Sequence, residues 1–89
     1  CWLMHWPGPG VHPTKKTIKP SDWTPRMRVD TFRAMVGLLG PSCRSVGVSN
    51  FSVRQLQHLH DATGVWPALN QLEVHLLCKR EDIVRFCQA

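Results

Sequence analysis

The sequence predicts an α/β fold in which short strands and helices alternate along a parallel sheet. Two patterns support this prediction: apolar runs of strand length occur between stretches with helical apolar spacing, and Gly or Pro residues separate them. The order strand, helix, strand, helix, strand, helix favours parallel strands joined by right-handed helical crossovers. Because the chain has 89 residues, we expect one small domain with a modest core.

The first predicted strand covers residues 1–5, an apolar run that fits the end of a buried strand. Residues 6–25 are rich in Pro and Gly, which predicts a long loop. Trp6 and Trp23 lie in this loop, and loops of such length that contain aromatic residues are more often functional than disordered.

A helix is predicted from about Arg26 to Leu39, where apolar residues recur at helical spacing and charged residues, Arg28 among them, take the other side. Gly40-Pro41 would end this helix, because Gly suits the left-handed position after a helix and Pro cannot continue one. We interpret Phe32, Met35 and Leu39 as helix packing residues.

The rest of the chain repeats the alternation. Further strands are predicted over residues 43–48 and 68–72. The helix between them follows a capping box, Ser52 to Gln55, and ends at Gly64. A third helix is predicted over residues 80–88.

The composition, 43% hydrophobic and 19% charged, is typical of a globular protein, and no apolar stretch approaches the roughly 20 residues of a membrane span. With no secretory leader in view, we expect a cytoplasmic protein that does not bind membranes. The chain starts at Cys1 inside an apolar run, so we interpret it as a piece of a longer chain. The net charge of +5 fits phosphate-bearing partners, although a basic solvated surface is the commoner explanation.

The four cysteines show neither C-x-x-C pairs nor the tight spacing of a disulfide scaffold, so we interpret them as reduced, buried thiols. A zinc site of Cys78, Cys87 and His75 is an alternative, but the spacing matches no common zinc finger. We therefore expect no metal site.

Polar residues occur where each predicted strand ends. They are His5, Ser49 and Asn50, then Asn70, Gln71 and Glu73. Because the carboxyl ends of parallel strands open onto one face, and chemistry in such folds collects there, these residues predict a functional site.

At these strand ends the chain resembles the aldo-keto reductase superfamily. The matching runs are Leu3–Pro7, Arg44–Phe51 and Pro67–His75, in the order and spacing of the family. The resemblance spans nearly the whole chain. It implies that residues 1–89 are a partial aldo-keto reductase domain, three successive β/α units (roughly the fourth to sixth) of a (β/α)8 TIM barrel.

The resemblance also implies a reaction, the reduction of aldehydes and ketones to alcohols by NADPH or, less often, NADH. His5 matches the family's His that orients the substrate carbonyl, and Trp6 resembles the aromatic wall of the substrate pocket. Ser49, Asn50 and Gln71 match the residues that hydrogen-bond the nicotinamide carboxamide, which needs hydroxyl and amide partners.

The chain also departs from the family pattern. It contains no tyrosine, so the family's Tyr proton donor, with its Asp and Lys partners, would lie outside these residues. Leu76 stands where the family commonly has Pro. We therefore expect the 89 residues alone to be inactive, and the parent protein to be a monomer.

Some of these residues also have structural interpretations. His5 taken alone fits a core or loop histidine, and Ser49-Asn50 fits a cap of the following helix. We interpret Glu73 and His75 as a structural polar pair, and His58 and His60 as surface residues.

Two other functions remain open. One is a basic nucleic-acid-binding module, although the chain lacks any nucleic-acid motif; its candidate residues are Lys15, Lys16, Lys19, Trp23, Arg26 and Arg28. The other is a truncated paralogue with no enzymatic role. In any of these cases three strands cannot close a barrel, so we expect the isolated chain to be marginally stable or to self-associate.

Overall fold

A three-stranded parallel sheet with the strand order β1-β2-β3 organises the chain. The structure is a computed structural model that describes residues 1–8 and 25–89. β1 spans Trp2–Met4, β2 spans Val46–Ser49 and β3 spans Asn70–Gln71. The predicted alternation of parallel strands and helices is therefore confirmed, while Trp23 and most of the predicted loop lie outside the described residues.

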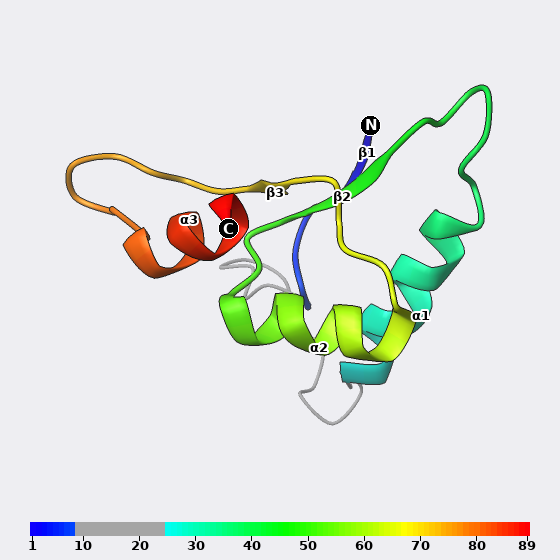
Figure 1. The fold of residues 1–89 in the computed structure, drawn as a ribbon, viewed down its shortest axis with the longest axis horizontal. Coiled ribbons are helices and arrows are strands. Elements are labelled where there is room, and N and C mark those ends of the chain that lie inside the picture. Colours follow the sequence, from blue (N-terminus) through cyan, green and yellow to red (C-terminus); the bar gives the residue numbers. More distant parts are fainter. Residues whose placement is uncertain (9–24) are drawn as a thin grey trace, which may run out of the picture.

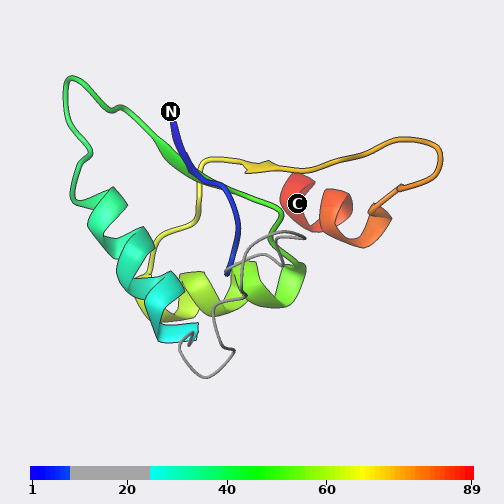
Figure 2. The same ribbon diagram turned by 180° about the vertical axis from the view of Figure 1, so that it is seen from behind.

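Helices follow each strand and share one side of the sheet. α1 spans Pro25–Val36, α2 spans Val53–Thr63 and α3 spans Glu81–Gln88. In Figures 1 and 2, α1 and α2 lie below the strands in both views, and α3 lies beside β3. Within the described part of the chain, no helix is long and apolar enough to cross a membrane.

The core lies between the central strand and the first two helices. Its fully buried members are Phe32 from α1, Val48 from β2, Phe51 from the following turn and Leu59 from α2. Each side chain of this kind removed from water stabilises the fold by about 1.5–3 kcal/mol, so this cluster is the main force that holds α1 and α2 to the sheet.

The second helix begins and ends as the sequence predicts. The Ser52 hydroxyl accepts a hydrogen bond from the Gln55 backbone N–H at 3.2 Å, and the Gln55 side-chain oxygen accepts one from the Ser52 N–H at 2.9 Å. Gly64 ends the helix in the left-handed region at φ 72°. The capping box thus satisfies two N–H groups that the helix itself leaves without partners.

The first helix ends earlier than predicted. It stops at Val36, and Leu39, which we interpreted as a packing residue, is 44% exposed. The N–H groups of Leu38 and Leu39 donate to carbonyls three residues back, those of Met35 and Val36. This tightened turn rotates Leu39 off the apolar stripe, so the prediction that the helix extends to Leu39 is wrong.

Strand boundaries also differ from the prediction. β2 begins at Val46, because Gly40 and Cys43 first pair with each other in a tight antiparallel bridge. β3 is limited to Asn70–Gln71, although the Ala68 N–H and the Leu69 carbonyl already bond to β2. Arg80 precedes α3 in the left-handed region at φ 50°.

The cysteines are free thiols, but they are not all buried. Cys43 is buried against the core and Cys78 is half-buried, whereas Cys1 and Cys87 are exposed. The prediction of buried thiols is therefore wrong for Cys1 and Cys87, because one precedes the edge strand β1 and the other lies near the carboxyl end of α3. Across residues 1–8 and 25–89, no three His, Cys, Asp or Glu side chains gather as a metal site.

The central strand is packed so closely that it tolerates no side chain at Gly47. A Cβ there would lie 2.8 Å from the Leu69 carbonyl oxygen and 2.9 Å from a Leu3 methyl group. We predict that Gly47→Ala lowers the free energy of unfolding by about 1–3 kcal/mol, as overpacking does. Gly40→Ala is the matched control, because nothing lies within 4 Å of its Cβ position. Urea unfolding followed by circular dichroism measures both, and equal midpoints would contradict the prediction.

Candidate functional site

The sheet register places three of the predicted site residues in one row. Met4 pairs with Val48, Val48 with Asn70, and Ser49 with Gln71. His5 follows Met4, so extending this register by one residue places His5 level with Ser49 and Gln71. The carboxyl ends of all three strands thus meet at one edge of the sheet, as the sequence predicts.

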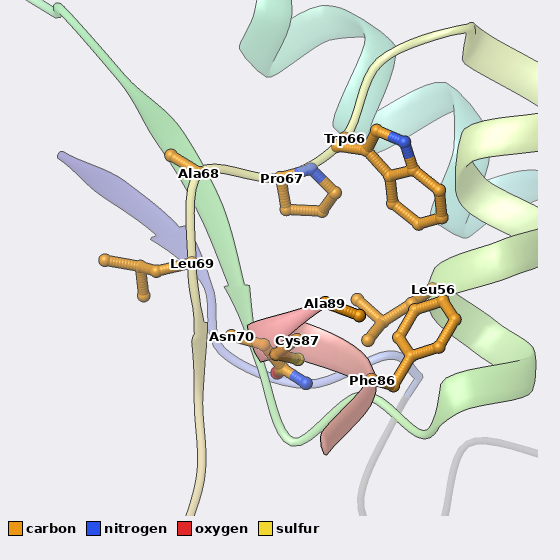
Figure 3. A pocket seen from close by; sticks show the side chains of 9 residues that line it. All are labelled: Leu56, Trp66, Pro67, Ala68, Leu69, Asn70, Phe86, Cys87 and Ala89. Carbon is orange, nitrogen blue, oxygen red and sulfur yellow. The ribbon is translucent and has the colours of Figure 1, made fainter. Parts of the chain in front are cut away.

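This row belongs to the face of the sheet that the helices do not cover. Leu3 and Leu69 flank Gly47 on that face, and strand alternation assigns the residues two positions on, His5, Gln71 and Ser49, to the same side. Figure 3 shows the Leu69 side chain on the opposite side of the chain from Asn70. In a closed barrel this face is the interior.

A hydrogen-bond chain joins the three strand ends. The Ser49 hydroxyl donates to the Gln71 carbonyl at 2.8 Å, and the Asn50 backbone N–H donates to the same oxygen at 3.0 Å. The Asn50 side-chain N–H₂ donates to the Ser49 hydroxyl at 3.1 Å and to the His5 carbonyl at 3.0 Å. The backbones that carry His5 and Gln71 are therefore fixed through Ser49 and Asn50.

Asn50 reaches both neighbours because of an uncommon backbone conformation. Its φ is 63°, in the left-handed region, which Asn tolerates better than most residues with a side chain. This conformation stops β2 at Ser49. Ser52 is the residue that caps α2, so the alternative in which Ser49-Asn50 caps the helix is wrong.

His5 and Trp6 lie at the open end of β1. Their rings stack with centroids 5.3 Å apart and planes 23° from parallel. Trp6 is 53% exposed and the His5 side chain is exposed as well, so the alternative of a core histidine is wrong. An exposed imidazole beside an indole can present a hydrogen bond to a small molecule in an aromatic-walled space.

Asn70 fixes the turn after β2, a role that the sequence analysis did not assign. Its side-chain oxygen accepts from the Phe51 N–H at 3.3 Å, and its N–H₂ donates to the Phe51 carbonyl at 2.9 Å. The sequence does indicate that Asn70 has a hydrogen-bond partner, because an amide within an apolar strand needs one. Since the partner is a backbone group in another element, the sequence alone could not name it.

Arg28 is not on the solvated side of α1, where the sequence analysis placed it. It is 7% exposed, and its Nε donates to the Pro7 carbonyl at 2.8 Å. Arg28 lies four residues before the buried Phe32, and this spacing places both side chains on the same face of α1. The spacing therefore indicates burial of Arg28, which the sequence analysis did not infer. Its burial also removes Arg28 from the basic surface that a nucleic-acid module would use, whereas Lys15, Lys16 and Lys19 lie outside the described residues.

His60 also differs from its interpretation as a surface residue. It is half-buried and stacks on Trp66 with ring centroids 4.0 Å apart, and Trp66 meets Phe86 of α3 edge-on at 5.8 Å. Trp66 and Phe86 border an apolar pocket of about 400 Å³ between α2 and α3 (Figure 3). The pocket lies on the helix side of the sheet, away from His5, Ser49 and Gln71.

The predicted pair of Glu73 and His75 is confirmed. His75 Nε2 lies 2.8 Å from a Glu73 carboxylate oxygen, and His75 Nδ1 accepts from the Leu77 N–H at 3.2 Å. Because Nδ1 is an acceptor, Nε2 carries the proton and donates it to Glu73. Backbone hydrogen bonds between His75 and Cys78 close the turn that follows, so the turn forms with Leu76 in place of Pro.

A comparison of the sequence with models of known protein families finds one match that covers the whole chain. The model of the aldo/keto reductase family matches residues 1–89. The chain belongs to the aldo/keto reductase family.

Curated relatives carry the names of carbonyl reductases. D/L-glyceraldehyde reductase of Hypocrea jecorina is 36% identical over 97% of this chain, and methylglyoxal reductase of Salmonella typhimurium is 34% identical over 92%. The chain spans 28% of the first relative and 25% of the second. These 89 residues thus correspond to about a quarter of each relative.

A solved structure has the fold that the sequence predicts. The crystal structure of the aldo/keto reductase from Brucella melitensis superposes with a TM-score of 0.73 and 30% identity, over 96% of this chain and 28% of that one. The predicted fold, three successive β/α units of a (β/α)8 TIM barrel, is therefore confirmed. In such a barrel the helices lie outside, and the face of the sheet that they leave uncovered, which carries the His5 row, would be the interior.

The strand ends fit the carboxamide of a nicotinamide cofactor. Within the described residues, the Asn50 side-chain oxygen and both polar atoms of the Gln71 amide have no hydrogen-bond partner. The Ser49 hydroxyl oxygen accepts from Asn50 and keeps a second lone pair. A carboxamide offers two N–H donors and one carbonyl acceptor. The Asn50 oxygen and the Ser49 hydroxyl can accept the two N–H groups, and the Gln71 amide can donate to the carbonyl.

We predict that Asn70→Asp destabilises the turn after β2. The carboxylate can still accept from the Phe51 N–H, but it replaces the donor to the Phe51 carbonyl with a second oxygen. The expected loss is about 1–3 kcal/mol in the free energy of unfolding, as for a partly buried hydrogen-bonding group left without its partner. Gln88→Glu makes the same chemical change at an exposed position and is the control. Unfolding midpoints and hydrogen exchange near Phe51 measure the effect, and an unchanged Asn70→Asp variant would show that the clamp carries no stability.

Proposed function

We propose that this chain supplies the carbonyl-orienting and nicotinamide-binding part of an NAD(P)H-dependent reductase of aldehydes and ketones. The observation that carries the proposal is the single row of His5, Ser49 and Gln71 at the strand ends, joined by the Asn50 side chain. In α/β barrels the carboxyl ends of the strands are where chemistry collects. Membership in the aldo/keto reductase family supports this reaction class.

In this proposal His5 orients the substrate carbonyl. Its imidazole is exposed and makes no hydrogen bond within residues 1–8 and 25–89, so a ring N–H is available to a carbonyl oxygen. Trp6, stacked on His5, forms the apolar wall beside that carbonyl. Holding the carbonyl in one orientation raises the rate because less rotational freedom is lost in the transition state.

Ser49, Asn50 and Gln71 would hold the carboxamide of the cofactor. When bound, the nicotinamide supplies a hydride for the carbonyl carbon. The side chains decide which ring face meets the substrate, because the Asn50 oxygen and Ser49 accept the amide N–H groups while Gln71 donates to the amide oxygen. We propose NADPH as the preferred cofactor and NADH as the alternative.

In the mechanism that the family resemblance implies, a Tyr supplies the proton that completes the alcohol. These residues include no tyrosine, so we propose that another part of the full-length protein supplies it. Two relatives are named as reductases of glyceraldehyde and methylglyoxal. Small aldehydes of this kind are the first substrates to test.

The decisive experiment is His5→Ala in the full-length protein that carries this chain. We predict that kcat for methylglyoxal falls at least about tenfold and that the stereochemical preference in the reduction of a prochiral ketone weakens, because the carbonyl loses its orienting donor. His58→Ala is the control, since His58 is exposed on α2, away from the strand ends. Steady-state kinetics and chiral product analysis measure both variants. Unchanged kinetics in His5→Ala would refute the assigned role.

A second prediction concerns the 89-residue chain by itself. We expect no oxidation of NADPH by methylglyoxal or glyceraldehyde above the uncatalysed rate, because a hydride transfer without a positioned acid leaves the alkoxide unprotonated. Absorbance of NADPH at high protein concentration measures this. Turnover that persists through purification, and disappears in His5→Ala, would mean that these residues contain their own proton donor.

A further inference from the structure

Arg28 connects α1 to the segment that leaves the site. Its Nε donates to the Pro7 carbonyl at 2.8 Å, although 21 positions separate the two residues. Pro7 directly follows Trp6, and as a proline it has no backbone N–H, so its carbonyl is its one polar backbone group. The hydrogen bond from Arg28 therefore holds the first residue beyond the His5–Trp6 pair.

The same guanidinium contacts the second strand end of the site. Its central carbon lies 5.8 Å from the centroid of the Phe51 ring, which is fully buried. Phe51 directly follows Asn50, and its backbone is clamped by Asn70. Arg28 thus lies between the residue after the proposed substrate wall and the residue after the proposed carboxamide contact.

The environment of Arg28 is unusual for a charged residue. It is 7% exposed, and burial lowers the pKa of its guanidinium. A guanidinium stays charged in proteins even so, which makes its hydrogen bond to a carbonyl charge-assisted and stronger than a neutral one. Taking this charge out of water is unfavourable, and a carbonyl, an aromatic ring and further contacts offset the loss.

We propose that Arg28 is a positioning residue for the site: its hydrogen bond to Pro7 and its contact with Phe51 fix Trp6 relative to Asn50. The inference rests on the proposed function of His5, Trp6 and Asn50, and it adds a residue from the helix layer. Arg28 lies beneath the strand ends and touches neither substrate nor cofactor. Its effect is on how the carbonyl is held, because the substrate wall moves when the Pro7 carbonyl is released.

The first test observes the hydrogen bond in the unaltered full-length protein that carries this chain. The Arg28 Nε–H should exchange with solvent at least about tenfold more slowly than that of Arg54, which is exposed on α2 and makes no hydrogen bond within the described residues. Nitrogen-15 NMR of the arginine side chains measures both rates. Equal rates would overturn the proposal, and this measurement needs no variant to fold.

The second test asks whether the hydrogen bond positions Trp6. The full-length protein labelled with 5-fluorotryptophan gives a fluorine signal for Trp6, assigned by its loss in Trp6→Phe. Arg28→Met keeps the aliphatic stem and removes the donor, so it should shift or broaden the Trp6 signal and leave that of Trp66 unchanged. Arg54→Met removes the same charge from an exposed position and should leave both signals unchanged. A Trp6 signal that does not respond to Arg28→Met would overturn the proposal.

Kinetics of the full-length protein separate this proposal from the proposed function. Arg28→Met should raise KM for the carbonyl substrate about tenfold with a smaller effect on kcat, whereas His5→Ala lowers kcat. Arg28→Lys, which keeps the charge and a donor, should recover part of the loss. Normal KM in Arg28→Met together with impaired His5→Ala would overturn the role of Arg28 alone. Normal kinetics in both would overturn the proposed function as well.

Discussion

The parallel pairing of β2 with both of its neighbours is the constraint on which the rest of this structure depends. Each residue of β2 is buried, and Gly47 allows the Leu69 backbone and the Leu3 side chain to approach it closely. The period of a strand is two residues, so a shift of one residue in either pairing would move Ser49 or its neighbours to the other face. The register therefore decides whether His5, Ser49 and Gln71 share a row.

Hydrogen bonds at the strand ends fix the proposed site residues relative to one another. Ser49 and Asn50 are bonded toward the neighbouring strands through some of their polar atoms, and other atoms of the same side chains remain available. A hydroxyl and an amide can do both because each is donor and acceptor at once. Apolar side chains could pack in these positions but could not leave directed groups for a ligand.

Two side chains on the helix side of the sheet support this arrangement, one from β3 and one from α1. Asn70 and Arg28 have polar groups that are satisfied by backbone atoms of the turns after β2 and β1, respectively. In each turn the residue whose backbone is held directly follows a proposed contact residue: Pro7 follows Trp6, and Phe51 follows Asn50. Substrate and cofactor contacts on loops gain precision when buried groups of the scaffold hold those loops in place.

The sequence by itself determined the order of elements, the capping box and Gly64 end of α2, and the presence of polar residues at three strand ends. These features depend on local chemistry and on the periods of helix and strand, which a sequence displays directly. The tertiary structure alone decided that Arg28 is buried, that Asn70 clamps Phe51, that His60 stacks on Trp66 and that α1 ends at Val36. The physical reason is common to all but the last. The partners of Arg28, Asn70 and His60 lie 21, 19 and 6 positions away along the chain, and only the folded backbone brings each pair together.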